Sequence, residues 1–244
     1  MSKKMRILVL GATSSIGLSI VKTFSKGNQL ILASSKYEKL KKIEQEFLNF
    51  DYENIKFIEI DLSLPINSKD MFKNFLCPDI IINAACASSK IKDSNMGPFN
   101  YKKITSVDLY SPLDIVDYFI QQKIKESDTS KVNYIFINTI LTKIKSPDYS
   151  IYTSYKLLHQ NYINSFNIKY GNHFNFINVI VGTQIDRNKE SKKSINLAER
   201  IKIALKNNEK EFIFGLKGKI KYIIYNISPV LSYIFIYLKR FVFK

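Results

Sequence analysis

The chain has 244 residues, a formal net charge of +16 and 45% hydrophobic residues. This length is enough to bury one sizeable core, so a single α/β domain is expected. Two cysteines and two histidines, at no metal-ligand spacing, exclude a disulfide framework and a predicted metal site. The composition fits a reduced, cytoplasmic setting, and the first residues hold no apolar stretch long enough for a secretory signal.

Short apolar runs alternate with amphipathic segments along the whole chain. Apolar runs predict strands over residues 7–10, 29–33, 55–60, 79–83, 133–139, 174–181 and 211–214. Helical spacing of apolar residues predicts helices after the first strand and over residues 36–48, 70–75, 99–122, 151–170 and 194–207. Pro112 is expected to kink its helix or to lie in a first turn, and Gly171 is expected to cap a helix. This alternation predicts a doubly wound parallel sheet with helices on both faces, in a domain of residues 1–216, followed by a hydrophobic segment over 217–244.

The first strand enters a turn that begins and ends with glycine. It runs Gly11-Ala-Thr-Ser-Ser-Ile-Gly17 and is followed by an amphipathic segment. The first N–H groups of a helix have no partner within it, and the helix dipole adds partial positive charge, so the turn suits a phosphate. Gly11 would allow a tight turn and Gly17 a close approach of helix to strand. Two glycines alone are equally compatible with an ordinary strand-to-helix turn.

Tyr152 and Lys156 lie four residues apart in the helix predicted after the fifth strand, so they share one helical face. An ammonium beside a phenol favours the phenolate and lowers the pKa of the phenol, as would a cationic nicotinamide ring nearby. The tyrosine then becomes a usable proton donor at neutral pH. Taken alone, the pair is also compatible with two surface residues. Its position matters because ligands of parallel sheets bind at the carboxyl ends of the strands.

Five short motifs, each after a predicted strand, resemble those of the short-chain dehydrogenase/reductase family. The resemblance covers roughly residues 5–200. The motifs are the turn 11–17, Asp61-Leu62, Asn83-Ala-Ala-Cys86, Tyr152-x-x-x-Lys156 and Asn178-Val-Ile-Val-Gly-Thr183. Each motif is modest alone, but five in the family's order indicate an NAD(P)-binding Rossmann-like fold and an oxidoreductase.

The resemblance implies a role for each matching residue. Tyr152 would be the catalytic acid/base, and Lys156 would bind the nicotinamide ribose. The family's catalytic serine position holds Thr139, whose hydroxyl can still bond a substrate carbonyl, and the family's asparagine position holds Asp108. That asparagine anchors a water through its backbone carbonyl, which Asp108 also has, but the carboxylate adds negative charge close to the lysine. Expected cofactor contacts are Gly11, Thr13, Ser14, Ser15, Ile16, Gly17, Asp61, Leu62, Asn83, Ala84, Ala85, Tyr152, Lys156, Gly182 and Thr183.

The chain also departs from the family pattern at two other positions. The middle glycine of the turn is replaced by Ser15, or by Ser14 in the Gly-x-x-Gly-x-x-Gly register of longer sugar-nucleotide members, and Val181 replaces a proline. After the second strand comes Ala33-Ser-Ser-Lys36, with no acidic residue before Glu38. An acid there would bind the ribose of NAD and repel the extra phosphate of NADP, so Ser34, Ser35 and Lys36 favour NADP. Alternatively, Lys36 simply starts a helix and points to solvent.

The end of the chain is basic and apolar. Residues 200–244 hold ten Lys or Arg and two Glu. The apolar stretch 222–238 has only 17 residues and contains Pro229, whereas a spanning helix needs about 20. Three interpretations stay open: a short tail anchor, packing over the substrate pocket or a subunit, and peripheral contact of residues 219–244 with anionic headgroups through Lys219, Lys221, Lys239, Arg240 and Lys244. Membrane association is slightly favoured.

An NADP-dependent dehydrogenase or reductase acting on a small carbonyl or alcohol is therefore the leading expectation. Nucleic-acid binding is disfavoured, because the aromatic residues lie among aliphatic ones. Ser15, Thr139 and Asp108 motivate an alternative, an NADP-binding protein without catalysis. A sugar-nucleotide-modifying enzyme of surface polysaccharide synthesis is another, with Lys90, Lys92, Arg187 and Lys189 gripping a diphosphate. Family resemblance further implies a homo-oligomer formed through the helices at 99–122 and 151–170.

Overall fold

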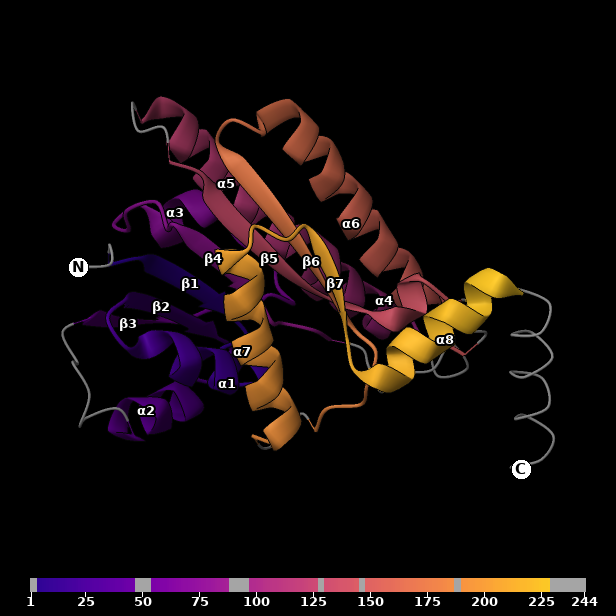
Figure 1. Ribbon diagram of the computed structural model, residues 1–244. Helices are drawn as coiled ribbons and strands as arrows, with labels where there is room; N and C mark the ends of the chain where they lie inside the picture. Colours follow the sequence, from indigo (N-terminus) through magenta and orange to yellow (C-terminus); the bar gives the residue numbers. More distant parts are fainter. Residues whose placement is uncertain are drawn as a thin grey trace.

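The computed structural model describes residues 4–46, 54–87, 97–126, 130–144, 148–186 and 190–228. Within these ranges, seven parallel strands form one sheet in the order β3-β2-β1-β4-β5-β6-β7 (Figure 1). The strands are β1 (Arg6–Leu10), β2 (Gln29–Ser34), β3 (Ile55–Glu59), β4 (Ile80–Asn83), β5 (Val132–Thr139), β6 (Phe174–Val181) and β7 (Glu211–Phe214). The predicted doubly wound parallel sheet is confirmed.

Helices cover both faces of the sheet (Figure 1). One face carries α1 (Ser15–Ser25), α2 (Tyr37–Glu46) and α7 (Lys192–Lys206), and the other carries α3 (Ser68–Phe72), α5 (Ser111–Lys125) and α6 (Ser150–Tyr170). Alternate residues of β1 face opposite ways: Ile7 and Val9 pack in the first core, and Leu8 and Leu10 pack in the second. Because both faces are covered, the inner strands β1, β2 and β4 are apolar except at their end residues, which is why apolar runs predicted them well.

The strand order reverses beside β1. From β1 the chain steps outward to β2 and β3 and then returns to β4 on the other side of β1. Leu10, the last residue of β1, pairs in register with Asn83, the last residue of β4. The crevice at such a switch point is where open α/β sheets bind ligands.

Several predicted helix boundaries need correction. The helix α3 begins at Ser68, two residues before the predicted start, because the Asn67 side chain accepts a hydrogen bond from the Asp70 N–H and caps it. The helix α6 ends at Tyr170 with Gly171 as its C-cap, as predicted, although Gly171 has φ −59° and does not adopt the left-handed conformation of many glycine caps. The predicted loop over 88–98 falls mostly outside the described residues, and its last residue, Pro98, already begins a helix.

The helix predicted over 99–122 consists of three pieces. They are α4 (Pro98–Thr105), a π-helical turn (Ser106–Tyr110) and α5. Pro112 lies in the first turn of α5, one of the two predicted outcomes. The wider π turn places Asp108 in the interior, with none of its surface exposed.

After β7 the chain forms a helix that the sequence did not predict, α8 (Leu216–Ile227). It lies beyond the carboxyl end of β7 (Figure 1). In the part of the chain that the structure describes, no helix combines the length and the apolar character needed to cross a membrane. Residues 229–244, with Lys239, Arg240 and Lys244, lie outside that part, so the three interpretations of the tail stay open there.

Candidate active site

The glycine turn after β1 has the geometry that the sequence predicts. Gly11 has φ 76°, a left-handed conformation that L side chains rarely adopt. A Cβ on Gly11 would lie 2.8 Å from the backbone of Ala85, and one on Gly17 would lie 2.2 Å from the Gly11 carbonyl oxygen. Glycine is therefore required at both ends of the turn, and the turn packs directly on the segment that follows β4.

Serines complete this turn. The Ser14 hydroxyl caps α1, accepting from the Gly17 N–H at 3.0 Å and donating to the Gly11 carbonyl at 2.8 Å. The Ser15 hydroxyl oxygen is buried and has no hydrogen-bond partner among the described residues. A buried hydroxyl without a partner, at a helix N-terminus that glycines keep open, fits a phosphate of a nucleotide. Ile16 instead packs against the core and anchors the first turn of α1.

The ends of β1 and β2 are joined by a hydroxyl pair. Thr13 Oγ1 lies 2.6 Å from Ser34 Oγ, and the Lys36 N–H donates to the same Ser34 oxygen at 3.3 Å. Ser34 is buried, whereas Ser35 and Lys36 are exposed. Of the three residues expected to select the cofactor, only Ser35 and Lys36 therefore offer their side chains to solvent.

The two motifs after β3 and β4 are held by local hydrogen bonds. The Asp61 carboxylate is exposed and accepts from both the N–H and the hydroxyl of Ser63, while Leu62 is buried in the core. Asn83 is fully buried, and its side-chain oxygen accepts from the Ala85 N–H at 3.2 Å. Ala84 is buried beside it. Asn83 thus shapes the turn after β4 with its own amide.

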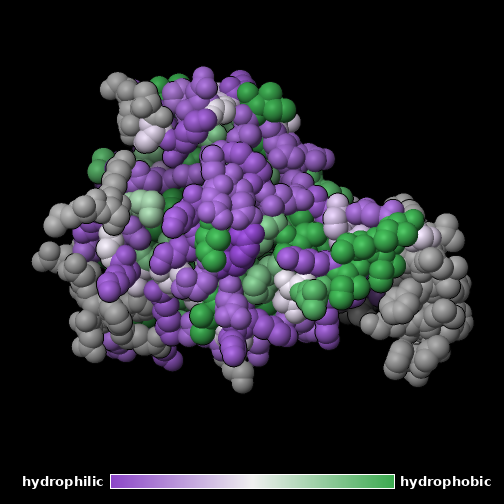
Figure 2. Space-filling model, in the orientation of Figure 1, coloured by the Kyte–Doolittle hydropathy of each residue, from purple (hydrophilic) through white to green (hydrophobic). Residues whose placement is uncertain are grey.

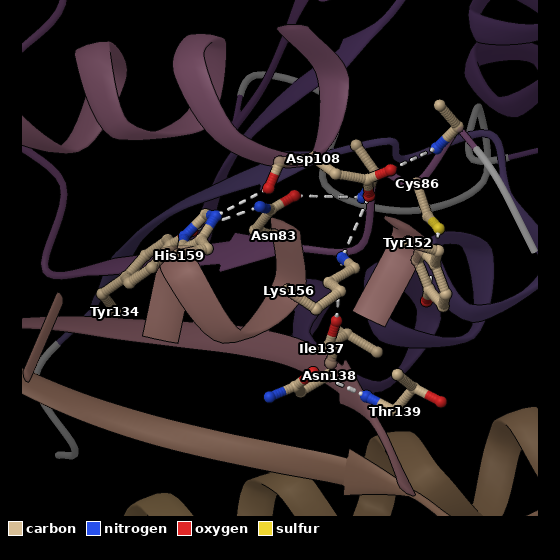
Figure 3. Close-up of polar contacts among 12 residues, drawn as sticks. Asn83, Cys86, Asp108, Tyr134, Ile137, Asn138, Thr139, Tyr152, Lys156 and His159 are labelled. Carbon is tan, nitrogen blue, oxygen red and sulfur yellow. Dashed lines mark hydrogen bonds and ion pairs between the residues drawn. The ribbon is translucent and has the colours of Figure 1, made fainter. Parts of the chain in front are cut away.

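The buried face of α6 carries the expected tyrosine and lysine. Tyr152 is 7% exposed and Lys156 is 1% exposed, and the Lys156 ammonium lies 5.9 Å from the centre of the Tyr152 ring. Cys86, which follows β4, places its sulfur 3.7 Å from the Tyr152 hydroxyl (Figure 3). Both side chains of the predicted pair therefore lie on one face, inside the molecule.

Lys156 forms an ion pair with Asp108. Its Nζ lies 3.1 Å from Asp108 Oδ1, and neither side chain is more than 1% exposed. The same ammonium lies 3.4 Å from the Ile137 carbonyl and 4.7 Å from the centre of the Phe136 ring. The other Asp108 oxygen accepts from the Ala87 N–H at 3.3 Å. The carboxylate that was expected close to the lysine is therefore in direct contact with it. Removing either charge would leave the other one buried without a partner.

Pro112 explains the unusual turn around Asp108. In an α-helix the Asp108 carbonyl would accept from the N–H four residues later, but Pro112 has none. The turn widens to a π turn, and His159 Nδ1 lies 2.9 Å from the Asp108 carbonyl oxygen. The resemblance had given this carbonyl the role of a water anchor. One of its two lone pairs is used by His159.

A buried chain of hydrogen bonds continues from His159 (Figure 3). His159 Nε2 lies 2.9 Å from the Tyr134 hydroxyl, which accepts from the Asn83 side-chain amide at 3.1 Å. A carbonyl only accepts, so His159 carries its proton on Nδ1 and Tyr134 donates to Nε2. Burial lowers the pKa of His159 to about 3, and the nearby charge of Lys156 also lowers it. Burial raises the pKa of Tyr134, so both groups stay neutral.

Thr139 is the last residue of β5, at the same edge of the sheet (Figure 3). Its hydroxyl accepts from the Leu141 N–H at 3.3 Å, and its carbonyl accepts from the Thr142 hydroxyl at 2.8 Å. The Asn138 side chain fixes its backbone, because Asn138 Oδ1 accepts from the Thr139 N–H at 2.8 Å. The hydroxyl retains its own proton as a donor.

Gly182 and Thr183 follow β6 and pack against the start of α8. The Gly182 N–H donates to the Phe214 carbonyl at 2.8 Å, and a Cβ on Gly182 would lie 2.5 Å from the Gly218 Cα. A Cβ on Gly215 would lie 2.9 Å from the Thr183 Cβ. Gly182 and Thr183, which are both expected to contact the cofactor, therefore lie against the residues that begin α8.

The sequence was compared with models of protein families. Residues 5–193 match the model of the short chain dehydrogenase family. The chain belongs to this family. Its members are NAD(P)-dependent dehydrogenases and reductases, so the chain is an enzyme of this oxidoreductase class. A search of curated proteins gave no significant match.

Solved structures of this family share the fold at low sequence identity. A short chain dehydrogenase from Burkholderia cenocepacia J2315 in complex with NADP has a TM-score of 0.79 and 13% identity, covering 96% of this chain and 98% of that one. An alcohol dehydrogenase from the archaeon Thermococcus sibiricus, complexed with 5-hydroxy-NADP, has a TM-score of 0.72 and 17% identity, covering 86% and 96%. The bulky-bulky ketone specific alcohol dehydrogenase from Comamonas testosteroni has a TM-score of 0.74 and 14% identity, covering 93% and 94%.

Three residues of this short-chain dehydrogenase contact predicted site residues but had no predicted role: Tyr134, His159 and Cys86, the last residue of the motif after β4. His159 had a detectable signal, because Tyr152, Lys156, His159 and Ile163 follow the spacing of one helical face and are the buried residues of α6. The contacts of Tyr134 and Cys86 join separate elements and leave no local pattern. The loop residues named for a sugar-nucleotide enzyme, Lys90, Lys92, Arg187 and Lys189, lie outside the described residues.

Proposed function

We propose that this short-chain dehydrogenase transfers hydride between NADP and a carbonyl or secondary alcohol, with Tyr152 as the acid/base. The observation that supports this most is the buried pair of Tyr152 and Lys156 on α6, at the carboxyl edge of the sheet. The lysine is held in place by Asp108 and by the Ile137 carbonyl. The Cys86 thiol, 3.7 Å from the Tyr152 hydroxyl, lies at the same edge of the sheet.

In the reductive direction, Tyr152 donates its phenolic proton to the carbonyl oxygen of the substrate. A bound nicotinamide supplies the hydride that reaches the carbonyl carbon, so the product is the alcohol. The Lys156 ammonium stabilises the phenolate left behind. The Thr139 hydroxyl donates a hydrogen bond to the same carbonyl oxygen, keeps its proton and orients the substrate. General acid catalysis of this kind contributes about 10²–10⁴-fold to a rate.

NADP is the proposed cofactor. Ser35 and Lys36 are exposed at the end of β2, and a hydroxyl with a cation suits a ribose phosphate. The buried Ser15 hydroxyl and the glycine turn would hold the pyrophosphate. Two similar solved structures contain NADP and a third contains 5-hydroxy-NADP, which is a property of those proteins.

One observation favours a second candidate, an NADP-binding protein with little or no catalysis. Asp108 lies 3.1 Å from Lys156, so its carboxylate offsets part of the positive field that Lys156 exerts on Tyr152. The asparagine expected from the resemblance would leave that field intact. The two candidates share the cofactor site and differ only in turnover.

Fluorescence titration with NADPH and NADH, followed by a screen of aliphatic, cyclic and aromatic ketones and aldehydes, tests both candidates. We expect tighter binding of NADPH than of NADH, and loss of NADPH absorbance with at least one carbonyl class. NADPH binding without turnover across the panel would support the second candidate. Binding of neither nucleotide would contradict both.

A further inference from the structure

The outer face of α8 is apolar and exposed. Five aliphatic side chains recur at intervals of three and four residues and so form one stripe along the helix. They are 45% to 78% exposed, and together we name them the isoleucine face: Leu216, Ile220, Ile223, Ile224 and Ile227. Figure 2 shows a large hydrophobic patch over α8, with smaller hydrophobic areas elsewhere in the view. Contiguous exposed apolar patches are uncommon on soluble proteins and mark interaction sites.

The opposite face of α8 fixes this orientation. Gly218 is the buried residue of the helix, and a Cβ on it would lie 2.3 Å from the Gly182 Cα, so the two backbones are in direct contact. Tyr222 and Tyr225 lie half-buried on the same side. Turning the isoleucine face inward would break the contact between Gly218 and Gly182. The helix is therefore docked with its apolar stripe directed away from the domain.

Lysines border the isoleucine face on both sides. At 100° per residue, Lys217 and Lys221 flank one edge of the stripe and Lys219 flanks the other. All three are exposed, and α8 contains no acidic residue. A helix with an apolar stripe between basic edges suits the boundary between headgroups and acyl chains. There the stripe enters the lipid, and the lysine stems lie along it with their ammonium groups among the phosphates.

We propose that α8 seats this protein on the surface of a lipid bilayer that carries anionic headgroups. The helix is the contact, and it lies in the plane of the surface. This inference stands apart from the proposed catalysis, because neither Tyr152 nor the cofactor site takes part in it.

Charge argues against a second copy of the chain as the occupant. Two isoleucine faces packed about a two-fold axis would bring the lysine borders of both helices together, with no acid on α8 to compensate. The chain already carries a net charge of +16, which repels another copy and attracts an anionic surface. Nucleic acid fits poorly, because aliphatic side chains neither stack on bases nor bind phosphates.

Vesicle co-sedimentation of the full chain tests the proposal. Wild-type protein is expected to sediment with vesicles of phosphatidylcholine and phosphatidylglycerol, and about tenfold less with phosphatidylcholine alone. The double variant Ile223→Ser/Ile227→Ser is expected to lose at least tenfold in binding to the mixed vesicles. Its matched control is Leu158→Ser/Ile168→Ser, which changes two aliphatic residues that are 53% and 86% exposed on α6 and should leave binding unchanged. Circular dichroism confirms that both variants are folded.

A charge variant separates the contribution of the lysines from that of the isoleucine face. Lys217→Gln/Lys219→Gln/Lys221→Gln is expected to bind the mixed vesicles more weakly and to prefer them less over phosphatidylcholine alone, because the three charges beside the stripe are gone. Failure of the wild-type chain to sediment with the mixed vesicles would overturn the proposal. So would wild-type-like binding by Ile223→Ser/Ile227→Ser, which would place the contact elsewhere in the chain. A concentration-dependent dimer abolished by that variant in analytical ultracentrifugation would assign the face to a second copy instead.

Discussion

Replacing His159 with asparagine should flatten the dependence of stability on pH. His159 is fully buried, donates from Nδ1 to the Asp108 carbonyl and accepts at Nε2 from Tyr134. An asparagine side chain in its place would keep a donor near the position of Nδ1 and would not titrate. If Nε2 were protonated in the folded protein, its N–H would face the O–H of Tyr134. Two donors would then meet without an acceptor, close to the charged Lys156. Folding therefore requires this histidine to stay neutral.

The sign and size of the effect follow from the two pKa values. In the folded protein the pKa of His159 is lowered to about 3 by burial, against an ordinary value of 6.5 in the unfolded chain. Between these values the unfolded state binds the proton and the folded state does not, so the stability contribution is complete above pH 6.5 and is lost as the pH falls. Each pH unit corresponds to about 1.4 kcal/mol, which gives about 2 kcal/mol between pH 6.5 and pH 5.

Urea denaturation followed by circular dichroism, at several pH values from 8 to 5, measures the free energy of unfolding of wild type and His159→Asn. His159→Asn should be less stable than wild type at pH 8, because it leaves the Tyr134 hydroxyl without its acceptor. The gap in free energy of unfolding should then shrink by about 2 kcal/mol by pH 5. Ile163→Ala, one helical turn further along the buried face of α6, is the matched control, since its cost of about 2–5 kcal/mol does not depend on proton binding. Parallel pH curves for wild type and His159→Asn would refute a buried neutral His159.

Two further predictions concern the charged residues. Asp108→Asn should lower the free energy of unfolding by about 3–5 kcal/mol, because it leaves the Lys156 ammonium buried without its partner, and adding Lys156→Met should recover much of that loss in urea denaturation. Strictly additive losses in the double variant would contradict the ion pair. Lys36→Glu should weaken NADPH binding about tenfold or more while leaving NADH binding little changed, because an exposed carboxylate at the end of β2 would repel the extra phosphate. Equal weakening of NADPH and NADH binding in fluorescence titration would contradict the placement of the extra phosphate beside Lys36.

The sheet could be predicted from the sequence because its physical cause is local. Strands covered on both faces are mostly apolar, and for β6 and β7 the predicted boundaries match the observed ones. The same holds for the glycine turn, where Gly11 and Gly17 are each required by a backbone approach closer than any Cβ allows. Tyr152 and Lys156 could be placed on one face from their spacing alone.

Contacts between distant elements could not be predicted in this way. His159 bonds the carbonyl of Asp108, 51 residues earlier, because Pro112 cannot supply the helical donor. Nothing in the residues around His159 indicates that partner. The ion pair of Asp108 and Lys156 was foreseen only as a charge close to the lysine, and its burial depends on the π turn. The domain boundary at 216 and the homo-oligomer stay predictions.

The helix α8 was missed for a different reason. The longer apolar stretch, with Pro229 inside it, overlaps a shorter amphipathic pattern. That pattern begins directly after Gly215 and ends at Ile227. The recurrence of aliphatic residues from Leu216 to Ile227 at helical intervals was available in the sequence. The backbone contact of Gly218 with Gly182, which orients the helix, was not.

The central claim is that Tyr152 donates the proton and that its hydroxyl contributes little to the affinity for the cofactor. The measurement that tests it most directly compares wild type, Tyr152→Phe and Ser154→Ala in steady-state reduction of a ketone and in NADPH titration. Ser154 is exposed on the same helix, and its hydroxyl bonds only the Ser150 carbonyl among the described contacts, so Ser154→Ala should behave as wild type. Tyr152→Phe should lose at least about 10²-fold in kcat while its Kd for NADPH stays within about twofold of wild type. Turnover by Tyr152→Phe at the wild-type rate would contradict the account.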